Sequence, residues 1–330
     1  MSKKLLFNLL AVLMLTSLVL VACGAPAPAA TAAPAKPAAA SAKPVLAFIP
    51  GQLANPSQAF AWKMFQKNAE KYGFEVIVLD GKGDVQEETK AINSAVAQKV
   101  AVIISNPNDG KAVAPALKAA RDAGIVVGIN MVKAAEGTEG SYDFWVAVDD
   151  NLGGQTAADA IMKQFPDGAT GVEIGGQAGH IAAMNRHDGF AKAIEGTNIT
   201  VLDYQNPQQW DTAQAQAIAE DMVTKYGDQI QFVFCHWDNG ATGVINALKA
   251  KGGMEDVLII GVDGNKTGFD QVGSWSNYMS IAQNVETIGN KSMEEAQLFL
   301  KKDSAAKAEN IIPFDVITTD TIGNFTAPEW

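Results

Sequence analysis

Short runs of apolar and β-branched residues alternate with longer segments of helical periodicity from Val45 to about Ile317. This alternation is typical of β-α units that build a parallel sheet. The pattern predicts strands over Val45–Ile49, Glu75–Leu79, Val102–Ile104, Ile125–Ile129, Trp145–Val148, Gly171–Ile174, Thr200–Leu202, Phe232–Phe234, Val257–Gly261, Tyr278–Ala282 and Ile312–Ile317. We therefore expect an α/β fold with helices on both faces of parallel sheets.

Helix boundaries support this interpretation. Asp84 and Glu87 have capping-box spacing before an apolar-periodic run, and Asn55 precedes a proline in the way that an N-cap precedes the first turn. Three glycines each follow an amphipathic segment and precede a predicted strand, as a left-handed C-terminal cap does: Gly73, Gly124 and Gly252.

The N-terminal segment has a different character. Lys3 and Lys4 precede the apolar run Leu5–Val21, which predicts an export signal over residues 1–22. The sequence Leu20-Val21-Ala22-Cys23-Gly24 resembles the bacterial lipoprotein box, which implies cleavage before Cys23, lipidation of its thiol and anchoring to the cell membrane on the extracytoplasmic side. The alternative is an ordinary cleaved signal with a chance cysteine. Residues 23–43 are rich in Ala and Pro and predict an extended linker.

The remaining chain, residues 44–330, is long enough for two domains of ordinary size. The whole sequence has a formal net charge of −11 and no cluster of basic residues, which argues against a nucleic-acid partner. Cys235 lies in a predicted buried strand, where we expect an inert thiol. His180, His187 and His236 do not have metal-ligand spacing, so no metal site is expected.

In an open parallel sheet, ligands bind beyond the carboxyl ends of the strands. The predicted strand ends lead into a polar, amide-rich and aromatic set that contains no nucleophile beside a base, so we expect neither catalysis nor a cofactor. The set comprises Asn55, Asn130, Met131, His180, Arg186, Trp210, Asp211, Trp237, Asp238, Asp263, Gln283 and Asn284.

These side chains suit a sugar, which presents hydroxyls that donate and accept hydrogen bonds together with an apolar C–H face. Asp263 accepts paired hydroxyls, Arg186 donates in a planar fork, and Asn55, Asn130 and Gln283 do both. The indole of Trp210 supplies apolar contact with a ring face.

Over Pro44 to Ile317 the chain resembles the type I periplasmic binding proteins for pentoses and hexoses. The sequence motifs on which the resemblance rests are Ala54-Asn55-Pro56, Asp149-Asp150-Asn151-Leu152-Gly153-Gly154, Arg186-His187-Asp188-Gly189-Phe190, Trp210-Asp211-Thr212-Ala213-Gln214-Ala215, Gly261-Val262-Asp263-Gly264 and Ile281-Ala282-Gln283. Each is weak alone, whereas their common order and spacing are specific.

The resemblance implies two doubly wound domains that are joined by three hinge crossovers and close on a ligand. It divides the chain into one lobe of residues 44–148 and 284–312 and a second of residues 149–283 and 313–330. It also implies a monomer that delivers a monosaccharide or polyol to an ABC permease and its ATPase. By the same resemblance, the ligand contacts are Asn55, Asn130, Met131, His180, Arg186, Trp210, Trp237, Asp263 and Gln283.

Some positions depart from the family pattern. Two aromatic residues that follow Asn-Pro in ribose binders are Ser57 and Gln58 here, so stacking on that side has to come from elsewhere, for example from Phe60 or Trp62. Three further departures indicate a more apolar pocket, suited to a deoxy sugar, a pentose or a polyol: Met131, Ala182 and Trp237. The acidic calcium loop of galactose/glucose binders has no counterpart, so no bound calcium is expected.

Plain structural roles compete with these ligand contacts. Trp210 and Trp237 also fit partly buried packing, Asp263 and His180 also fit helix caps, and Arg186 also fits a surface salt bridge. For two acidic residues a hinge or cap role is favoured over ligand contact, namely Asp150 and Asp238.

Other functions compete with the capture of a sugar. A sugar-responsive repressor needs an N-terminal helix-turn-helix, where this chain has an export signal. A dehydrogenase or hydrolase needs a Gly-rich dinucleotide motif, a nucleophile elbow or a paired nucleophile and base, none of which occurs. A sensor subunit that presents ligand to a chemoreceptor or receptor kinase, or a binder of a non-sugar solute, stays open.

Overall fold

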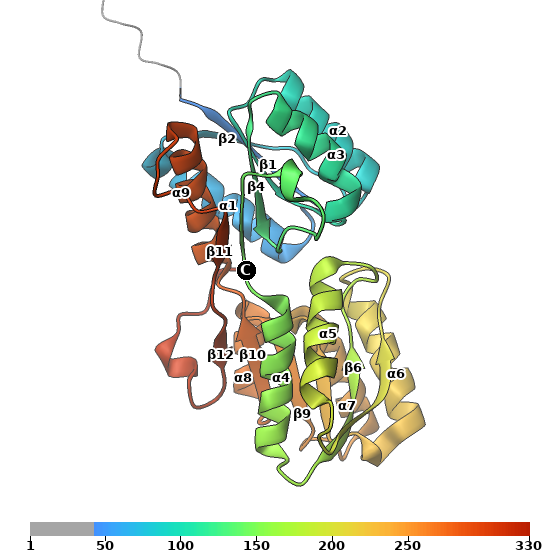
Figure 1. Cartoon of the computed structure of the whole chain (residues 1–330). Coiled ribbons are helices and arrows are strands. Elements are labelled where there is room, and N and C mark those ends of the chain that lie inside the picture. The colour runs from blue at the N-terminus through green and yellow to red at the C-terminus, as the bar shows by residue number, and fades with distance from the viewer. Residues whose placement is uncertain (1–42) are drawn as a thin grey trace, which may run out of the picture. The chain divides into compact units, whose positions relative to one another are not determined.

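The computed structural model describes residues Lys43–Trp330, which contain two six-stranded sheets (Figure 1). The predicted signal over residues 1–22, the lipidation site at Cys23 and nearly all of the predicted linker lie outside the described residues. No helix within Lys43–Trp330 is long and apolar enough to cross a membrane.

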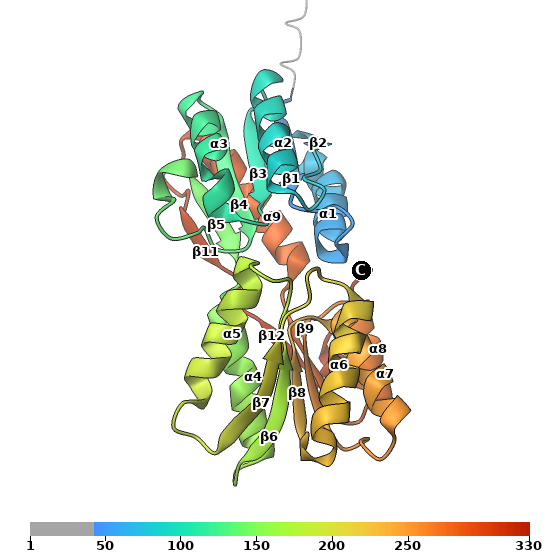
Figure 2. The same cartoon turned by 90° about the vertical axis from the view of Figure 1, so that its right-hand side faces the viewer.

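The first sheet has the strand order β11-β5-β4-β3-β1-β2, and its strands pair in parallel. Its helices are α1 and α9 on one face and α2 and α3 on the other, as two separate hydrophobic clusters and Figure 2 show. The elements are β1 (Val45–Pro50), α1 (Pro56–Tyr72), β2 (Glu75–Val78), α2 (Val85–Ala97), β3 (Val102–Asn106), α3 (Gly110–Asp122), β4 (Val126–Met131), η1 (Glu139–Ser141), β5 (Phe144–Ala147), α9 (Val285–Lys301) and β11 (Glu309–Ile311).

The second sheet has the order β12-β10-β9-β8-β6-β7, in which only β12 is antiparallel to its neighbour. Helices α4 and α5 cover one face, and α6, α7 and α8 cover the other (Figure 2). The elements are α4 (Asp150–Gln164), β6 (Ala169–Ile174), α5 (Ile181–Ile194), β7 (Ile199–Gln205), α6 (Thr212–Tyr226), η2 (Gly227–Gln229), β8 (Phe232–Cys235), α7 (Asp238–Lys251), β9 (Leu258–Asp263), α8 (Lys266–Ser274), β10 (Tyr278–Ala282), β12 (Asp315–Ile317) and η3 (Ile322–Asn324).

The chain passes between the two sheets after β5, after β10 and after β11. The fold class is therefore confirmed as α/β, with two parallel-sheet domains and three connections between them. The residue boundaries of the two lobes stay a prediction.

The expected run over Ile312–Ile317 is wrong as a single strand. Residues Glu309–Ile311 form β11 beside β5 in the first sheet, whereas Asp315–Ile317 form β12 beside β10 in the second. Pro313 lies between them and cannot donate to a strand ladder. The third connection therefore occupies residues that the hydrophobic pattern assigns to one element.

The predicted N-caps at Asn55 and Asp84 and the left-handed end at Gly73 are confirmed, whereas Gly252 ends α7 with φ 74° and ψ 154°, outside the left-handed helical region. Asn55 caps α1 by accepting from the amides of Ser57 and Gln58, and Asp84 caps α2 in the same way. Gly73 has a φ of 76° at the end of α1, a conformation that glycine adopts without steric cost. These caps place the start of α1 at the carboxyl end of β1.

Candidate functional site

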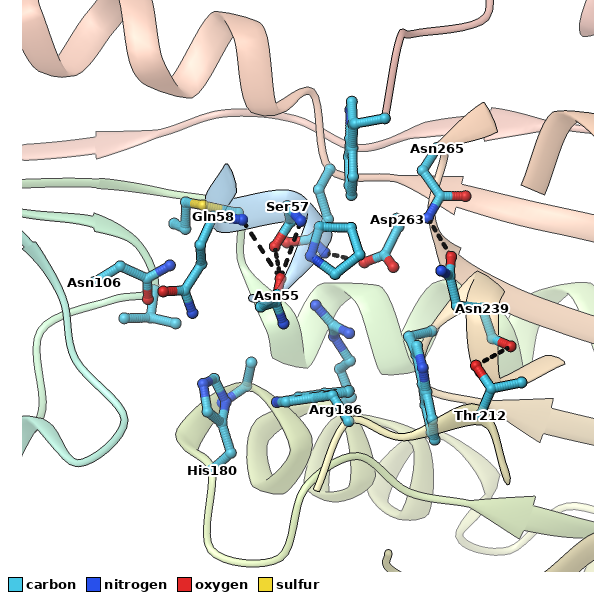
Figure 3. A pocket seen from close by; sticks show the side chains of 18 residues that line it. Asn55, Ser57, Gln58, Asn106, His180, Arg186, Thr212, Asn239, Asp263 and Asn265 are labelled. Carbon is cyan, nitrogen blue, oxygen red and sulfur yellow. Dashed lines mark hydrogen bonds between the residues drawn. The ribbon is translucent and has the colours of Figure 1, made fainter. Parts of the chain in front are cut away.

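A cavity of about 130 Å³ lies at the carboxyl ends of strands from both sheets. Figure 3 shows polar side chains from both sheets around it. The lining residues are Asn55, Pro56, Ser57, Gln58, Asn106, Met131, Val132, His180, Ala182, Arg186, Trp210, Thr212, Trp237, Asn239, Asp263, Asn265, Gln283 and Trp330. Eight of the nine ligand contacts predicted from the sequence therefore meet around one cavity, and Asn130 is the exception.

Asn55 reaches the cavity from the start of α1. Its side-chain oxygen accepts from the backbone amides of Ser57 and Gln58 and from the Ser57 hydroxyl, at 2.7–3.4 Å. The oxygen is thus used within the protein, whereas no hydrogen bond within the described residues uses the amide nitrogen. The cap fixes the side chain and leaves its two N–H donors for a ligand.

Arg186 is buried, with a relative exposure of 2%, so the surface salt-bridge interpretation is wrong. Its Nε donates to the Asp150 carboxylate at 2.9 Å, and its Nη1 donates to the main-chain oxygen of His236. Figure 3 shows the guanidinium extending from α5 toward Asn55. Because Asp150 balances its charge, Arg186 presents oriented donors to the cavity with little net charge.

His180 caps α5, because its Nδ1 accepts from the amide of Ala182 at 3.2 Å, and it also lines the cavity. Burial, with a further contribution from Arg186, lowers the pKa of His180 to about 4. The imidazole is therefore neutral near pH 7. Since Nδ1 is occupied as an acceptor, the neutral ring carries its proton on Nε2, which is free to donate.

Two indoles lie together on the side of the second sheet. The Trp210 ring meets Trp237 edge-on at a centroid distance of 5.4 Å, and Arg186 lies 5.9 Å from the Trp210 ring. Trp237 is 5% exposed, and its Nε1 has no hydrogen-bond partner in the described residues. The two rings supply apolar surface, and Trp237 adds one buried donor beside the cavity.

Asp263, at the end of β9, accepts from the Gln283 amide at 2.6 Å. The neighbouring turn is held by Asp238, whose carboxylate accepts from the Gly264 amide, the Tyr278 hydroxyl and Ser280 Oγ at 2.6–2.9 Å. Burial and the nearby Asp238 charge raise the pKa of Asp263, and burial raises the pKa of Asp238. Asp238 therefore positions the turn, as its predicted structural role suggests, while Asp263 lines the cavity.

Asn130 lies one residue before Met131 at the end of β4 and is fully buried. Its amide oxygen and nitrogen both lack a partner within the described residues. Met131 lines the cavity with a φ of 66°, a left-handed conformation that is uncommon outside glycine and asparagine. Asn130 is thus adjacent to the cavity without lining it, and its ligand contact stays a prediction.

Sequence reasoning missed several lining residues: Asn106, Val132, Thr212, Asn239, Asn265 and Trp330. Asn106 ends β3, which extends two residues beyond the predicted strand end at Ile104. Asn239, in the first turn of α7, and Asn265, the N-cap of α8, hydrogen bond to each other at 2.7 Å. The strand-end rule would have found Asn106 with correct boundaries, whereas Trp330 follows the last predicted strand and carries no such signal.

The chemistry of this lining favours binding over reaction. It combines amides, one balanced guanidinium, the Asp263 carboxyl, a neutral imidazole and indoles. Within Lys43–Trp330, no group of three or more His, Cys, Asp or Glu side chains is arranged to hold a metal ion. Cys235 is buried below the site, and burial raises the pKa of its thiol.

Residues 46–304 match the family model described as periplasmic binding protein domain. The chain belongs to the periplasmic binding protein family. It is therefore a binding protein and not an enzyme. It is similar to the ribose import binding protein RbsB of Escherichia coli, with 32% identity over 262 residues that cover 79% of this chain and 86% of the relative. It is also similar to RbsB of Bacillus subtilis, with 30% identity over 244 residues that cover 74% and 77% of the two chains.

Solved structures of this periplasmic binding protein family share the fold. A solute-binding protein from Actinobacillus succinogenes with bound D-allose matches with a TM-score of 0.78 and 22% identity, covering 86% of this chain and 100% of that one. The myo-inositol-binding protein of Caulobacter matches with a TM-score of 0.78 and 22% identity, covering 86% and 95%. At this identity the matches establish the fold of the described residues.

Proposed function

We propose that the chain captures one neutral monosaccharide or polyol in the cavity between its two sheets and delivers it to an ABC importer. The observation that carries the proposal is the lining itself. Donors and acceptors from the first sheet (Asn55, Asn106) and from the second (Arg186, Asp263) surround the same space, together with indole rings. Such a set matches the hydroxyls and the C–H face of a sugar.

Electrostatics favour an uncharged ligand. The Arg186 guanidinium is compensated by Asp150, and His180 is neutral near pH 7 because its pKa is lowered to about 4. Because the pKa of Asp263 is raised, ionising its carboxyl before a ligand binds costs free energy. Hydrogen bonds donated by ligand hydroxyls offset that cost. A polyhydroxylated molecule satisfies these groups through hydrogen bonds and needs no charge of its own.

The importer role is supported by the relatives, whose names describe import of ribose and of fructose. A ligand that contacts residues of both sheets stabilises the arrangement in which both reach it, so a permease can distinguish loaded from empty protein. We further propose that Cys23 is lipidated and holds the protein at the outer face of the cell membrane, and that it acts as a monomer.

The test is a thermal-shift screen of the purified full chain against D-ribose, D-xylose, D-fructose, D-galactose, D-allose, L-arabinose, D-fucose and myo-inositol, with amino acids and nucleosides as the comparison set. A ligand at 100 times its Kd adds about 2.7 kcal/mol to the free energy of unfolding. A raised Tm with at least one sugar or polyol is expected. Shifts only with amino acids or nucleosides would overturn the proposed ligand class.

A further inference from the structure

On the first-sheet side of the cavity, the aromatic residues that the sequence suggests as ligand contacts are not the ones that line it. Ser57 and Gln58 line the cavity where ribose binders carry aromatic rings, and the suggested substitutes do not line it. Phe60 is buried in the cluster between α1, α9 and the first sheet, and Trp62 packs against the same cluster. A ring that contacts a ligand on this side therefore belongs to another residue.

Trp330 occupies that place. It lines the cavity together with Asn55, Pro56 and Ser57, although it lies far from them in the sequence. It also lines a neighbouring cavity of about 550 Å³, to which Phe60 belongs. Among residues 43–330, Trp330 and Asp263 are the two that line both spaces, so they lie where the two cavities meet.

Trp330 is held by one contact of its ring and one of its main chain. Its ring stacks on Phe60 of α1 with a centroid distance of 5.7 Å and an interplanar angle of 21°. Its main-chain oxygen accepts from the amide of Lys266, the first residue of α8, at 2.6 Å. Phe60 belongs to the first sheet's helices and Lys266 to the second's, so the segment Phe325–Trp330 bridges elements of both sheets beside the cavity.

We propose that Trp330 is a specificity-determining residue of the ligand site, and that its indole stacks on the apolar C–H face of the sugar. This inference rests on the proposed function. Phe60 supports the indole by stacking, and Arg186 and Trp210 line the same cavity. A rigid ring supplies contact area at small conformational cost, so a pre-stacked indole suits this role.

The choice of ligand follows from this arrangement. The Trp330 indole selects among sugars by the apolar face that they present. The side-chain amides and Asp263 select among them by the positions of the hydroxyl groups. Trp330→Ala should therefore weaken binding most for ligands with a large C–H face, such as D-fucose with its methyl group, and least for glycerol, which has no ring.

The experiment is calorimetric titration of the full chain with the best-binding sugar of the panel above. Trp330→Ala is expected to raise Kd by at least about tenfold, as truncation of a central aromatic contact does, while Trp330→Phe keeps Kd within about threefold. Trp62→Ala is the matched control, because it removes a tryptophan from the same cluster without touching the cavity and should leave Kd unchanged.

The outcomes separate this inference from the proposed function. If Trp210→Ala abolishes sugar binding but Trp330→Ala leaves Kd unchanged, with an unchanged circular dichroism spectrum, the function stands and the role of Trp330 is overturned. An equal loss in Trp330→Ala and Trp62→Ala would also overturn it, because the effect would then come from the cluster. If the wild type binds no member of the panel, the proposed function fails, and the inference fails with it.

Discussion

Two non-glycine residues at the cavity hold a positive φ, namely Met131 at 66° and Asp263 at 127°. Both end a central strand of their sheet, one strand in each. Such conformations cost on the order of 1–3 kcal/mol and persist where the surroundings fix them. At Asp263 the backbone is held by the neighbouring turn, which Asp238 stabilises through its hydrogen bonds. The strained backbone conformation therefore sets the direction in which the Asp263 carboxylate faces.

Asp263→Ala and Trp210→Ala should each weaken sugar binding by more than about tenfold while the fold stays intact. The first removes an acceptor and leaves ligand hydroxyls unpaired, and the second removes a ring at the cavity. Calorimetry on the sugar identified by the screen measures both. Asp270→Ala is the control, since Asp270 lies on the exposed surface of α8 and pairs with Lys266, and this variant should bind the sugar normally. Unchanged affinity in both test variants would contradict the placement of the site.

At residue scale the sequence predicts most of the cavity for one physical reason. Carboxyl ends of parallel strands meet at one edge, so residues that follow predicted strands converge. Asn106 is missed because the predicted strand stops at Ile104, and Trp330 because its position depends on tertiary contacts with Phe60 and Lys266. Asn55 and His180 each cap a helix and also line the cavity. Only the hydrogen bonds of the folded chain show that one side chain serves both roles.

At the scale of elements, α4 and α5 pack unusually closely. A Cβ on Gly154 would lie 2.0 Å from the main-chain oxygen of Arg186, and one on Gly189 would lie 2.0 Å from that of Asn151. The same two helices carry the buried pair Asp150–Arg186. The spacing of these helices therefore sets where the Arg186 guanidinium lies.

Gly154→Ala should push α4 away from α5, lower the free energy of unfolding by about 1–3 kcal/mol and weaken sugar binding through displacement of Arg186. Chemical denaturation and calorimetry measure the two effects. Gly273→Ala is the control, because Gly273 is exposed in α8 and a Cβ there meets nothing within 4 Å. That change should stabilise by about 0.5–1 kcal/mol. A neutral Gly154→Ala would show that the helices do not need this contact.

Helix α2 carries a buried acid, Glu88, whose carboxylate accepts from the side-chain and main-chain N–H groups of Asn108. Burial raises the pKa of Glu88 to about 7, against the opposing effect of these hydrogen bonds. The folded state thus holds a proton that the unfolded state releases near pH 4.5, and this contribution to stability is lost as pH rises toward 7.

Glu88→Gln should consequently gain stability relative to the wild type between pH 5 and pH 8, by on the order of 2 kcal/mol. Urea denaturation at the two pH values gives the difference. Glu87→Gln, on the same helix but exposed to solvent, should show no such gain, because its pKa is lowered by Lys90 and it stays ionised across this range. Parallel pH dependence in Glu88→Gln and the wild type would contradict this account of Glu88.

For the whole molecule, periodicity and caps predict the α/β class, and the resemblance adds the division into two sheets. The order of strands within each sheet and the antiparallel pairing of β12 follow from tertiary contacts that no local pattern encodes. The prediction over Ile312–Ile317 shows the limit, since only Asp315–Ile317 of this run form a strand of the second sheet, while Glu309–Ile311, just before the run, pair with the first.

The central claim is that one sugar is held by both sheets at once. A crystal structure of the full chain with the sugar selected by the thermal-shift screen tests it most directly. We predict a single sugar in the cavity that contacts Asn55 at the start of α1 and Asp263 at the end of β9 simultaneously. A sugar bound elsewhere, or one that contacts side chains of only one sheet, would contradict the account.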